Sequence, residues 1–524
     1  MHKKKELASA ILCCLLIMAA LLFPQEKNPA KTARAMTLRD CIAGALANNL
    51  DLAIAAFNPD INREAVAATR EKYLPQFNLA FNKLDQNQPG TWGVEGTSVL
   101  TKSDTYTLSL SERIVTGTTA SLSFSNGMSN TSRTFTVINP SYNSSFLLNL
   151  TQPLLRGFGP KINRIDTLQA ENQRDISVSA LKSMVIQTVY DVEDAYWSLY
   201  SALENRKVQE ESLEQSRTLL RKNREAVRIG AKSALDILNS EAEVAQYEDT
   251  LVQAQLTVEQ SESRLKRMLN LPVEAQAAGE TIVPADKPTI EKRDISYEAA
   301  VQIALEERPE MSQSEKELEN YDYSLSYYRN DLLPQLDLTF STWSPGQSGV
   351  KNLYDNDNPF MGNVIGRVEG SRMDAFREAL RRTYKNWSLK LNLSIPFGNI
   401  FARSNLAKAK MEREQAVQRQ EQQRQGIAYE ISEAIKSLQN AGRKVESSRA
   451  SRELQEKRAA AETQRYQLGL AGSEWLLSYQ RQLTNARTSE IRAIIDYKLA
   501  AARLEKAMGT TLRTMGLKFR DYEF

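Results

Sequence analysis

The chain has 524 residues, of which 25 % are charged and 41 % are hydrophobic, and its formal net charge is +3. Long stretches rich in Ala, Gln, Glu, Lys and Arg are typical of long helices flanked by solvent, and they argue against one deep globular core. The whole chain has one histidine and three cysteines, so few residues are available for a catalytic or metal site that needs several of them together.

The first element, residues 1–35, is predicted to be a secretory signal peptide. Lys3, Lys4 and Lys5 precede an apolar run over residues 7–23, and Ala33-Arg34-Ala35 offers the small-x-small pattern of a cleavage site. An uncleaved membrane anchor is the alternative, because the run approaches the ~20 residues of a spanning helix. A lipoprotein signal fits less well, because Leu12 is not the small residue expected before a lipidated cysteine.

Cleavage changes both the charge and the chemistry of the chain. Six basic and two acidic residues leave with the segment, so the net charge of +3 becomes −1 and nucleic-acid binding loses its main support. His2 also leaves, and Cys41 remains as the only cysteine. A histidine-based triad, a His/Cys metal cluster and an intrachain disulfide are therefore excluded. No phosphate-binding glycine loop is present either, so we predict no cofactor, no metal site and no enzyme.

The rest of the chain is an internal duplication. Leu74-Pro75-Gln76 recurs as Leu333-Pro334-Gln335 at an offset of 259 residues, and Gly230 recurs as Gly469 at an offset of 239 within a second matched block. The first repeat is predicted over residues 36–271 and the second over 295–511. Residues 272–294 form a linker, and residues 512–524 form a C-terminal tail.

Both repeats follow one plan. A helical stretch (37–72 and 296–332) is followed by strands (about 74–152 and about 335–396) and then by a long helical hairpin (161–271 and 399–508). Proline cannot continue a helix interior or a regular ladder, and it stands at each border. These border prolines are Pro75, Pro153, Pro334 and Pro396.

The hairpin helices are unusually long. Residues 161–229 contain neither Gly nor Pro, and as one helix they would span roughly 100 Å. A narrow apolar seam at three- and four-residue spacing predicts helices packed side by side in a coiled coil or a ring. The seam consists of Ile186, Val189, Val192, Tyr196, Leu199 and Leu203. The second half is predicted to be looser, because Gly426 and Gly442 interrupt it. Gly230 and Gly469 are predicted to take positive φ and to reverse the chain between helices.

Alternating polar and apolar residues predict strands with one apolar face. They cover residues 105–110, 120–124, 145–151, 335–340 and 387–395. A soluble sandwich would give the same pattern, but the export signal and the long helices favour strands of a membrane barrel. One chain has too few strands to close a barrel with a lumen, so several chains are expected to combine. The extra pair 105–112 and 118–126 in the first half could widen the barrel, lengthen its strands or form an external loop.

Over residues 36–524 the sequence resembles the TolC-like outer-membrane efflux protein family. The resemblance rests on the duplicated Leu-Pro-Gln, the duplicated X-Pro after a strand, and the helix turns NREAVRIGAKSALDIL (223–238) and QRYQLGLAGSEWLLSY (464–479). It implies a homotrimer with a shared β-barrel in the outer membrane and an α-helical barrel of coiled-coil hairpins in the periplasm. A periplasmic adaptor and an inner-membrane pump, or a type I secretion system, would deliver the substrate to this passive duct. Outer-membrane lipid would surround the barrel.

The resemblance also implies roles for residues at the turns. The adaptor would dock at Ile229, Gly230, Ala231, Leu468, Gly469 and Leu470. The candidates for the periplasmic gate are Asp236, Tyr466, Glu474 and Trp475. Trp475 stands where the family usually has an aspartate, which is a departure that bears on the charge of the gate.

A periplasmic coiled-coil adaptor or a structural envelope protein is the alternative function. It would account for the signal and the helices, but it does not require amphipathic strands in both halves. The exported substrate and the class of pump are left open by the sequence.

Overall fold

The computed structural model describes residues 33–90, 96, 98–133, 136–271, 281–290, 295–355, 358, 360 and 363–517. The chain divides into two compact units, and each draws on both repeats. The first unit comprises Met1–Ile54, Ser183–Arg308 and Ile427–Phe524, and the second comprises Ala55–Lys182 and Pro309–Gly426. The two sequence repeats are therefore interleaved and do not form two separate domains.

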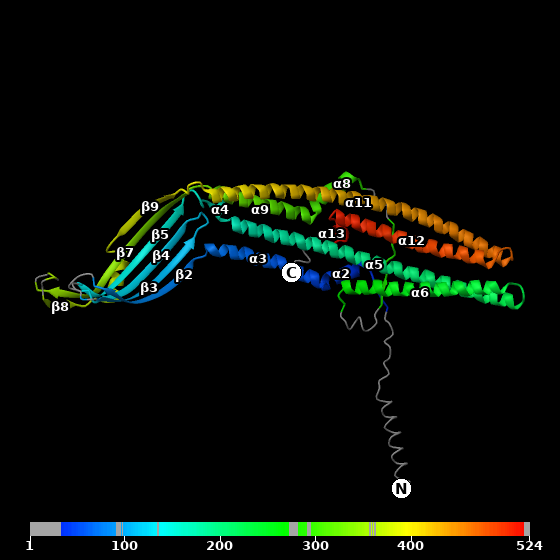
Figure 1. Cartoon of the computed structure of the whole chain (residues 1–524), viewed down its shortest axis with the longest axis horizontal. Helices are drawn as coiled ribbons and strands as arrows, with labels where there is room; N and C mark the ends of the chain where they lie inside the picture. Colours follow the sequence, from blue (N-terminus) through cyan, green and yellow to red (C-terminus); the bar gives the residue numbers. More distant parts are fainter. Residues whose placement is uncertain are drawn as a thin grey trace, which may run out of the picture. The chain divides into compact units, whose positions relative to one another are not determined.

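The elements of the first repeat follow the expected order (Figure 1). They are β1 (Ala33–Met36), α2 (Leu38–Asn48), α3 (Leu50–Arg70), η1 (Glu71–Tyr73), β2 (Gln76–Pro89), β3 (Ser98–Arg113), β4 (Thr119–Thr131), β5 (Ile138–Pro153), α4 (Pro160–Asn163), α5 (Ile165–Arg228) and α6 (Ala234–Met268).

The second repeat begins after β6 (Thr281–Pro284), which lies in the predicted linker. Its elements are α8 (Tyr297–Glu307), α9 (Pro309–Asp331), β7 (Gln335–Tyr354), β8 (Val364–Val368), α10 (Arg372–Arg381), β9 (Asn386–Ser394), α11 (Ile400–Gln467), α12 (Ser473–Ala507) and α13 (Thr511–Thr514).

The opening helix of each repeat is broken at an equivalent position. The break falls at Asn49 in the first repeat and at Arg308 in the second, again 259 residues apart. Thr37 begins α2 with a capping box completed by Asp40, and the Ser296 side chain caps α8. The helical stretch predicted in each half (37–72 and 296–332) is therefore two helices, with the break at an equivalent position.

The second unit contains an antiparallel sheet in the order β2-β3-β4-β5-β7-β8, with β9 also paired to β7. Gln76 and Gln335 begin β2 and β7 directly after Pro75 and Pro334, and Pro153 ends β5. Pro396 follows the end of β9 at Ser394. All four border prolines thus lie at the ends of strands, where a missing N–H donor is tolerated.

The extra pair in the first half belongs to the sheet. β3 pairs along its length with both β2 and β4, and β4 pairs with β5. Long strands β2, β3, β4, β5, β7 and β9 run side by side (Figure 1). The three possibilities that the sequence left open are therefore resolved, because the additional hairpin adds two strands to the sheet itself.

The register places apolar side chains on one face of this sheet. Phe77 lies opposite Leu110, Leu110 opposite Leu122, and the pattern continues across β5, β7 and β9. This apolar face consists of Phe77, Leu79, Phe81, Tyr106, Leu108, Leu110, Leu122, Phe124, Phe146, Leu148, Leu150, Leu336, Leu338, Phe340, Trp387, Leu389, Leu391 and Leu393. The opposite, polar face carries mostly Ser, Thr and Asn.

The first unit holds most of the helical hairpins, with α5 from Ser183 and α11 from Ile427 onward. Salt bridges Arg217–Glu248 (2.7 Å) and Arg264–Asp194 (2.6 Å) tie α6 antiparallel to α5. Lys444–Asp496 (3.0 Å) ties α12 to α11 in the same way. These exposed pairs fix the pairing of the helices but each contributes little stability.

The prediction that the second half is looser was wrong. α11 runs unbroken over 68 residues through both Gly426 and Gly442. Glycine is compatible with helical φ and ψ and costs only about 1 kcal/mol relative to alanine, which packing along so long a helix outweighs. Gly442 also lies against the ring of Tyr497, where a larger side chain would meet the partner helix.

The main core of the first unit lies where α2, β1, β6 and α13 meet the hairpins. Val189, Val192 and Leu199 from the predicted seam are fully buried there, beside Cys41 and Ala45 of α2. The Asp286 backbone N–H donates to the Tyr196 hydroxyl (3.1 Å), which links the end of β6 to the seam. Burial raises the pKa of the Cys41 thiol to about 12, as expected for an inert structural cysteine.

Most of the predicted signal peptide, residues 1–32, lies outside the described residues. Ala33-Arg34-Ala35, the predicted cleavage motif, lies in β1, which pairs in parallel with β6. Cleavage after Ala35 would leave only Met36 of that strand. No single helix in the described part of the chain is long and apolar enough to cross a membrane, whereas α2 with α3 and η1 meets that criterion as a pair bent by 54°.

Candidate functional site

The two glycine turns have the same hydrogen-bond geometry. Gly230 has φ +77° and Gly469 has φ +75°. In each turn the glycine N–H donates three residues back, and the next N–H donates five residues back, as in a Schellman cap. These bonds run from Gly230 to Val227 (3.0 Å), from Ala231 to Ala226 (2.8 Å), from Gly469 to Tyr466 (3.1 Å) and from Leu470 to Arg465 (2.8 Å). The duplicated glycines therefore end two long helices in the same way.

The side chains around the turns are apolar and solvent-exposed within one chain. Ile229, Leu468 and Leu470 are 69 %, 74 % and 67 % exposed. Three large apolar residues at two adjacent turns are left uncovered by the described part of the chain, which is the pattern of an interaction surface. Their predicted role in adaptor docking stays a prediction.

Asp236 has two structural roles near the first turn. Its carboxylate accepts from the Ser233 backbone N–H (3.2 Å) and completes the capping box that begins α6. The same carboxylate accepts a hydrogen bond from the Ser473 hydroxyl at the start of α12. Asp236 therefore both caps its own helix and links one hairpin to the other.

The second turn lacks this capping box. Gly472 and Trp475 stand at the positions equivalent to Ser233 and Asp236, and α12 has no side-chain cap. Trp475 is 63 % exposed, and Glu474 is exposed as well. The structure does not bring these two predicted gate residues together with Asp236 or with Tyr466.

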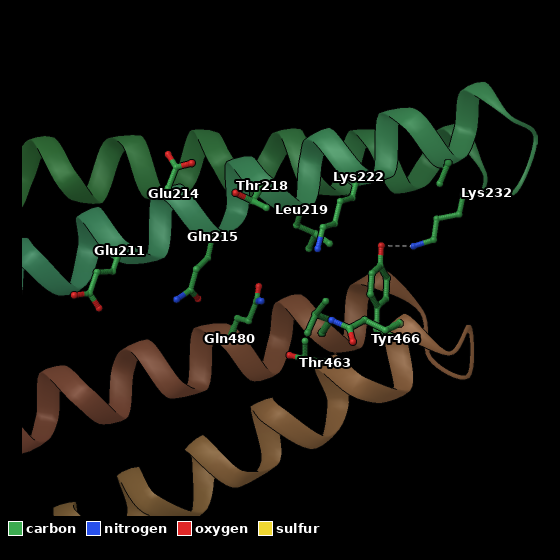
Figure 2. Close-up of a pocket in the computed structure, with 13 residues that line it drawn as sticks. Glu211, Glu214, Gln215, Thr218, Leu219, Lys222, Lys232, Thr463, Tyr466 and Gln480 are labelled. Carbon is green, nitrogen blue, oxygen red and sulfur yellow. Dashed lines mark hydrogen bonds between the residues drawn. The ribbon is translucent and has the colours of Figure 1, made fainter.

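Tyr466 joins a second link between the hairpins (Figure 2). Its hydroxyl contacts the Lys232 ammonium and donates to the Asn223 side-chain oxygen. Lys232 also donates to Asn223 (3.1 Å) and lies 3.7 Å from the centroid of the Tyr466 ring. Asn223 is fully buried and donates to Ser240 of α6 (2.8 Å). One tyrosine of α11 is thus held by polar groups of the α5–α6 hairpin.

These links close one end of a groove between the hairpins. The groove has a volume of about 860 Å³ and is lined by Glu211, Glu214, Lys222, Thr463, Leu476 and Gln480, among others. Figure 2 shows Tyr466 pointing from its helix toward Lys232 at that end. Leu219, Leu476 and Leu477 form a small apolar cluster against which Tyr466 packs.

A buried polar cluster lies further along the hairpins. The Ser212 and Thr484 hydroxyls are 2.8 Å apart, and Tyr247 packs beside them. The Glu243 side chain is 7 % exposed, and its nearest cation, Arg481 Nε, is 3.7 Å away, too far for a hydrogen bond. Burial raises the pKa of the Glu243 carboxyl, and Arg481 opposes that shift only in part.

The sequence comparison between repeats missed Lys232, Asn223, Ser240 and Ser473. The first three correspond to Ala471, Glu462 and Tyr479 in the second repeat, so a search for duplicated residues passes over them. Each link uses residues that differ between the halves, because two unlike hairpins face each other across it. The only indication of this link in the sequence was that Lys232 lies two residues after Gly230, next to the first turn.

Comparisons with known proteins agree with this architecture. The model of the family described as outer membrane efflux protein matches residues 41–271 and 300–510, which are the two repeats. No curated protein matches the chain.

Several solved structures share the fold. A membrane protein from Pseudomonas aeruginosa is 20 % identical with a TM-score of 0.65, covering 90 % of both chains. The CmeC outer membrane channel of Campylobacter jejuni is 17 % identical with a TM-score of 0.62, covering 90 % of this chain and 86 % of that one. The MtrE outer membrane channel of Neisseria gonorrhoeae, solved in an open state, is 18 % identical with a TM-score of 0.60, covering 91 % and 89 %. The duplicated strand-and-hairpin unit, its match to the family model and its fold together identify this chain as a TolC-like member of the outer membrane efflux protein family.

Proposed function

We propose that this protein is the outer-membrane channel-tunnel of a tripartite efflux or type I secretion system. It conducts substrates passively from an inner-membrane pump across the periplasm and the outer membrane. The observation that carries this proposal is one chain that combines an amphipathic sheet, open at both edges, with long helical hairpins whose outer apolar residues are left uncovered by the described part of the chain.

The open edges call for further copies of the chain. β2 has one neighbour, β3, and β9 has one neighbour, β7, among the described strands, so each leaves a row of unpaired backbone groups. α3 adds an apolar stripe of Leu50, Ile54, Phe57 and Ile61, all more than 60 % exposed. A second copy that pairs its β9 with β2 would satisfy the backbone and cover such stripes.

Three copies would place eighteen long strands around one axis, six from each chain. Barrels of sixteen to eighteen strands leave an aqueous channel. The apolar face would meet lipid, and the polar face would line the lumen with small hydroxyl and amide groups. Lumenal examples are Asn78, Thr107, Ser109, Ser123, Ser125, Ser145, Asn149, Ser341, Ser388 and Asn392.

The helical hairpins would form the periplasmic tunnel, and their turns would form its closed tip. The links Asp236–Ser473 and Tyr466–Lys232 hold the two hairpins of a chain together. An adaptor that docks on the apolar turns at Ile229 and Leu468 would compete with this packing and open the tip. Transport then needs no chemistry in this protein, since the pump supplies the energy.

Single-channel conductance in planar lipid bilayers tests the proposal. The purified full-length protein is expected to insert as trimers and to produce discrete conductance steps. Cell fractionation is expected to recover it with the outer membrane. A monomer that remains in the soluble fraction and leaves the bilayer silent would contradict the proposal.

A further inference from the structure

One helix of the second unit lies on the apolar face of the sheet. The Phe376 ring of α10 stacks edge-on against Phe124 of β4 at 5.4 Å and lies 5.9 Å from Phe146 of β5. Arg372 pairs with Asp104 and lies over the rings of Tyr106 and Tyr142. All of these sheet residues point to the apolar face, so α10 sits on the side that the proposed function turns toward lipid.

α10 covers the apolar face of the sheet at the level where small residues follow the large apolar ones. Along β5 the apolar series stops at Phe146, and the next residue on that face is Ser144, which is 3 % exposed. On β7 the same level is occupied by Gly346, whose missing Cβ would lie 2.1 Å from the Ala375 carbonyl. Serine and glycine thus let the backbone of α10 approach the sheet closely, and α10 presents its outer side chains instead.

The outer side of α10 is amphipathic. Met373 and Leu380 lie on one flank and are 53 % and 58 % exposed. Arg377 and Arg381 follow at the helix surface that points away from Ala375 and Ala379, which are fully buried. Tyr384 (55 % exposed) lies three residues after the helix, and Trp387 (69 % exposed) lies at the start of β9. Apolar and aromatic side chains beside arginines are the composition of a membrane-interface segment.

The acidic side chains of α10 have partners within the chain, whereas its outer arginines have few. Asp374 completes the capping box at Ser371, and Glu378 accepts from the Gln347 backbone N–H (2.8 Å). The acidic groups are therefore occupied by the fold. Arg377 lies 3.7 Å from Asp374, and Arg381 makes no ion pair with any residue that the structure describes. The Arg381 guanidinium is therefore available for an anion outside the chain, and the Arg377 guanidinium is engaged only by a long, exposed ion pair that a phosphate can displace.

We propose that α10 is an interfacial helix that binds phosphate groups of anionic lipid in the outer leaflet through Arg377 and Arg381. This inference rests on the proposed function, because it requires the apolar face of the sheet to meet lipid. Met373 and Leu380 enter the acyl region while the arginines reach the phosphates above it. Planar guanidinium groups suit this ligand because they bind phosphate oxygens in pairs.

The test compares the full-length trimer with the double variant Arg377→Gln/Arg381→Gln. The probe is diphosphoryl lipid A in phosphatidylcholine vesicles, with phosphatidylcholine alone as the reference, and binding is followed by flotation. The double variant is expected to bind the phosphorylated vesicles about 30-fold more weakly, because each arginine near an anionic surface adds its own share of the attraction. Both proteins are expected to bind phosphatidylcholine equally.

Two control variants separate charge from folding and position. Arg224→Gln/Arg228→Gln removes the same charge from the other unit and should bind like the wild type. Arg377→Lys/Arg381→Lys keeps the charge and should retain most of the binding. Equal binding of the double variant and the wild type to lipid A would overturn the inference, as would a wild type that shows no preference for phosphorylated vesicles.

Conductance of the wild type in phosphatidylcholine bilayers is measured in parallel. Channels that form normally while the lipid A preference is absent would refute the role of α10 and leave the proposed function intact. Absence of channels would instead refute the proposed function itself.

Discussion

Removal of one hydroxyl group should loosen the proposed closed tip. In Tyr466→Phe the ring keeps its packing against Leu219 and its position over Lys232, but no hydroxyl remains to bond with Lys232 and Asn223. The ring contact survives because it depends on the aromatic face. The substitution therefore removes the polar part of one link between the hairpins and little else.

The magnitude follows from the hydrogen bonds that the hydroxyl makes. A hydrogen bond that involves a charged group contributes about 1.5–3 kcal/mol, but Lys232 and Asn223 still bond to each other at 3.1 Å. We therefore expect the proposed closed state to be destabilised by roughly 1–2 kcal/mol per chain, which shifts the opening equilibrium about 5- to 30-fold for each chain. The stability of the trimer should change little, since the hairpins keep their other packing.

Single-channel recording in planar bilayers measures this directly as open probability. Tyr479→Phe is the matched control, because the Tyr479 hydroxyl makes no hydrogen bond with any residue described in the structure, and its ring stays near Arg458. The control should conduct like the wild type. If Tyr466→Phe has an unchanged open probability while its trimers remain intact, the link does not hold the tip closed and this reasoning is wrong.

Four further substitutions test other features. Gly230→Ala should destabilise the fold by about 1 kcal/mol because of the positive φ alone, since nothing lies within 4 Å of the added Cβ. Gly426→Ala, within a helix, should stabilise the fold by a similar amount. The two variants should therefore shift the thermal unfolding midpoint in opposite directions, and shifts of the same sign would contradict the turn geometry. Glu243→Gln should raise the unfolding midpoint at pH 7.5 and change it little below pH ~4.5. The reason is that burial raises the pKa of Glu243 in the folded state. The wild type is therefore most stable when this carboxyl is protonated, and it loses that stability as the pH rises through the folded-state pKa. A lower midpoint for the variant at pH 7.5 would show that the ion pair with Arg481 dominates. Gly346→Ala should displace α10, because the new Cβ would lie 2.1 Å from the Ala375 carbonyl oxygen and 2.6 Å from the Ala379 nitrogen. Trypsin should then cleave within α10 faster than in the wild type. An unchanged cleavage rate would refute the close packing of α10 on the sheet.

The fold was largely predictable because its determinants are local and periodic. The period-two alternation of 105–110 and 387–395 marked β3 and β9, and the absence of Gly and Pro marked α5. The duplication carried further information, since matched glycines indicated two equivalent turns. Each of these signals depends on residues close together in the chain.

Other features depend on which segments meet in three dimensions. The sequence could not place the pair 105–112 and 118–126, because a hairpin in a sheet and a hairpin in a loop share the same alternation. The looser second half that Gly426 and Gly442 suggested was a wrong prediction, because packing along α11 outweighs local propensity. The contact between Lys232 and Tyr466 spans 234 residues, and no periodicity encodes such a pair.

Disulfide trapping between sheet edges tests the central claim most directly. Ala80 in β2 and Ser388, Lys390 or Asn392 in β9 all lie on the polar face, so cysteines are introduced at Ala80 together with each of these in turn. Native Cys41 is fully buried and stays silent. If copies join edge to edge around a common lumen, at least one pair will yield oxidised trimers on a non-reducing gel. Monomers at every pair, in protein recovered from the outer membrane, would contradict the account.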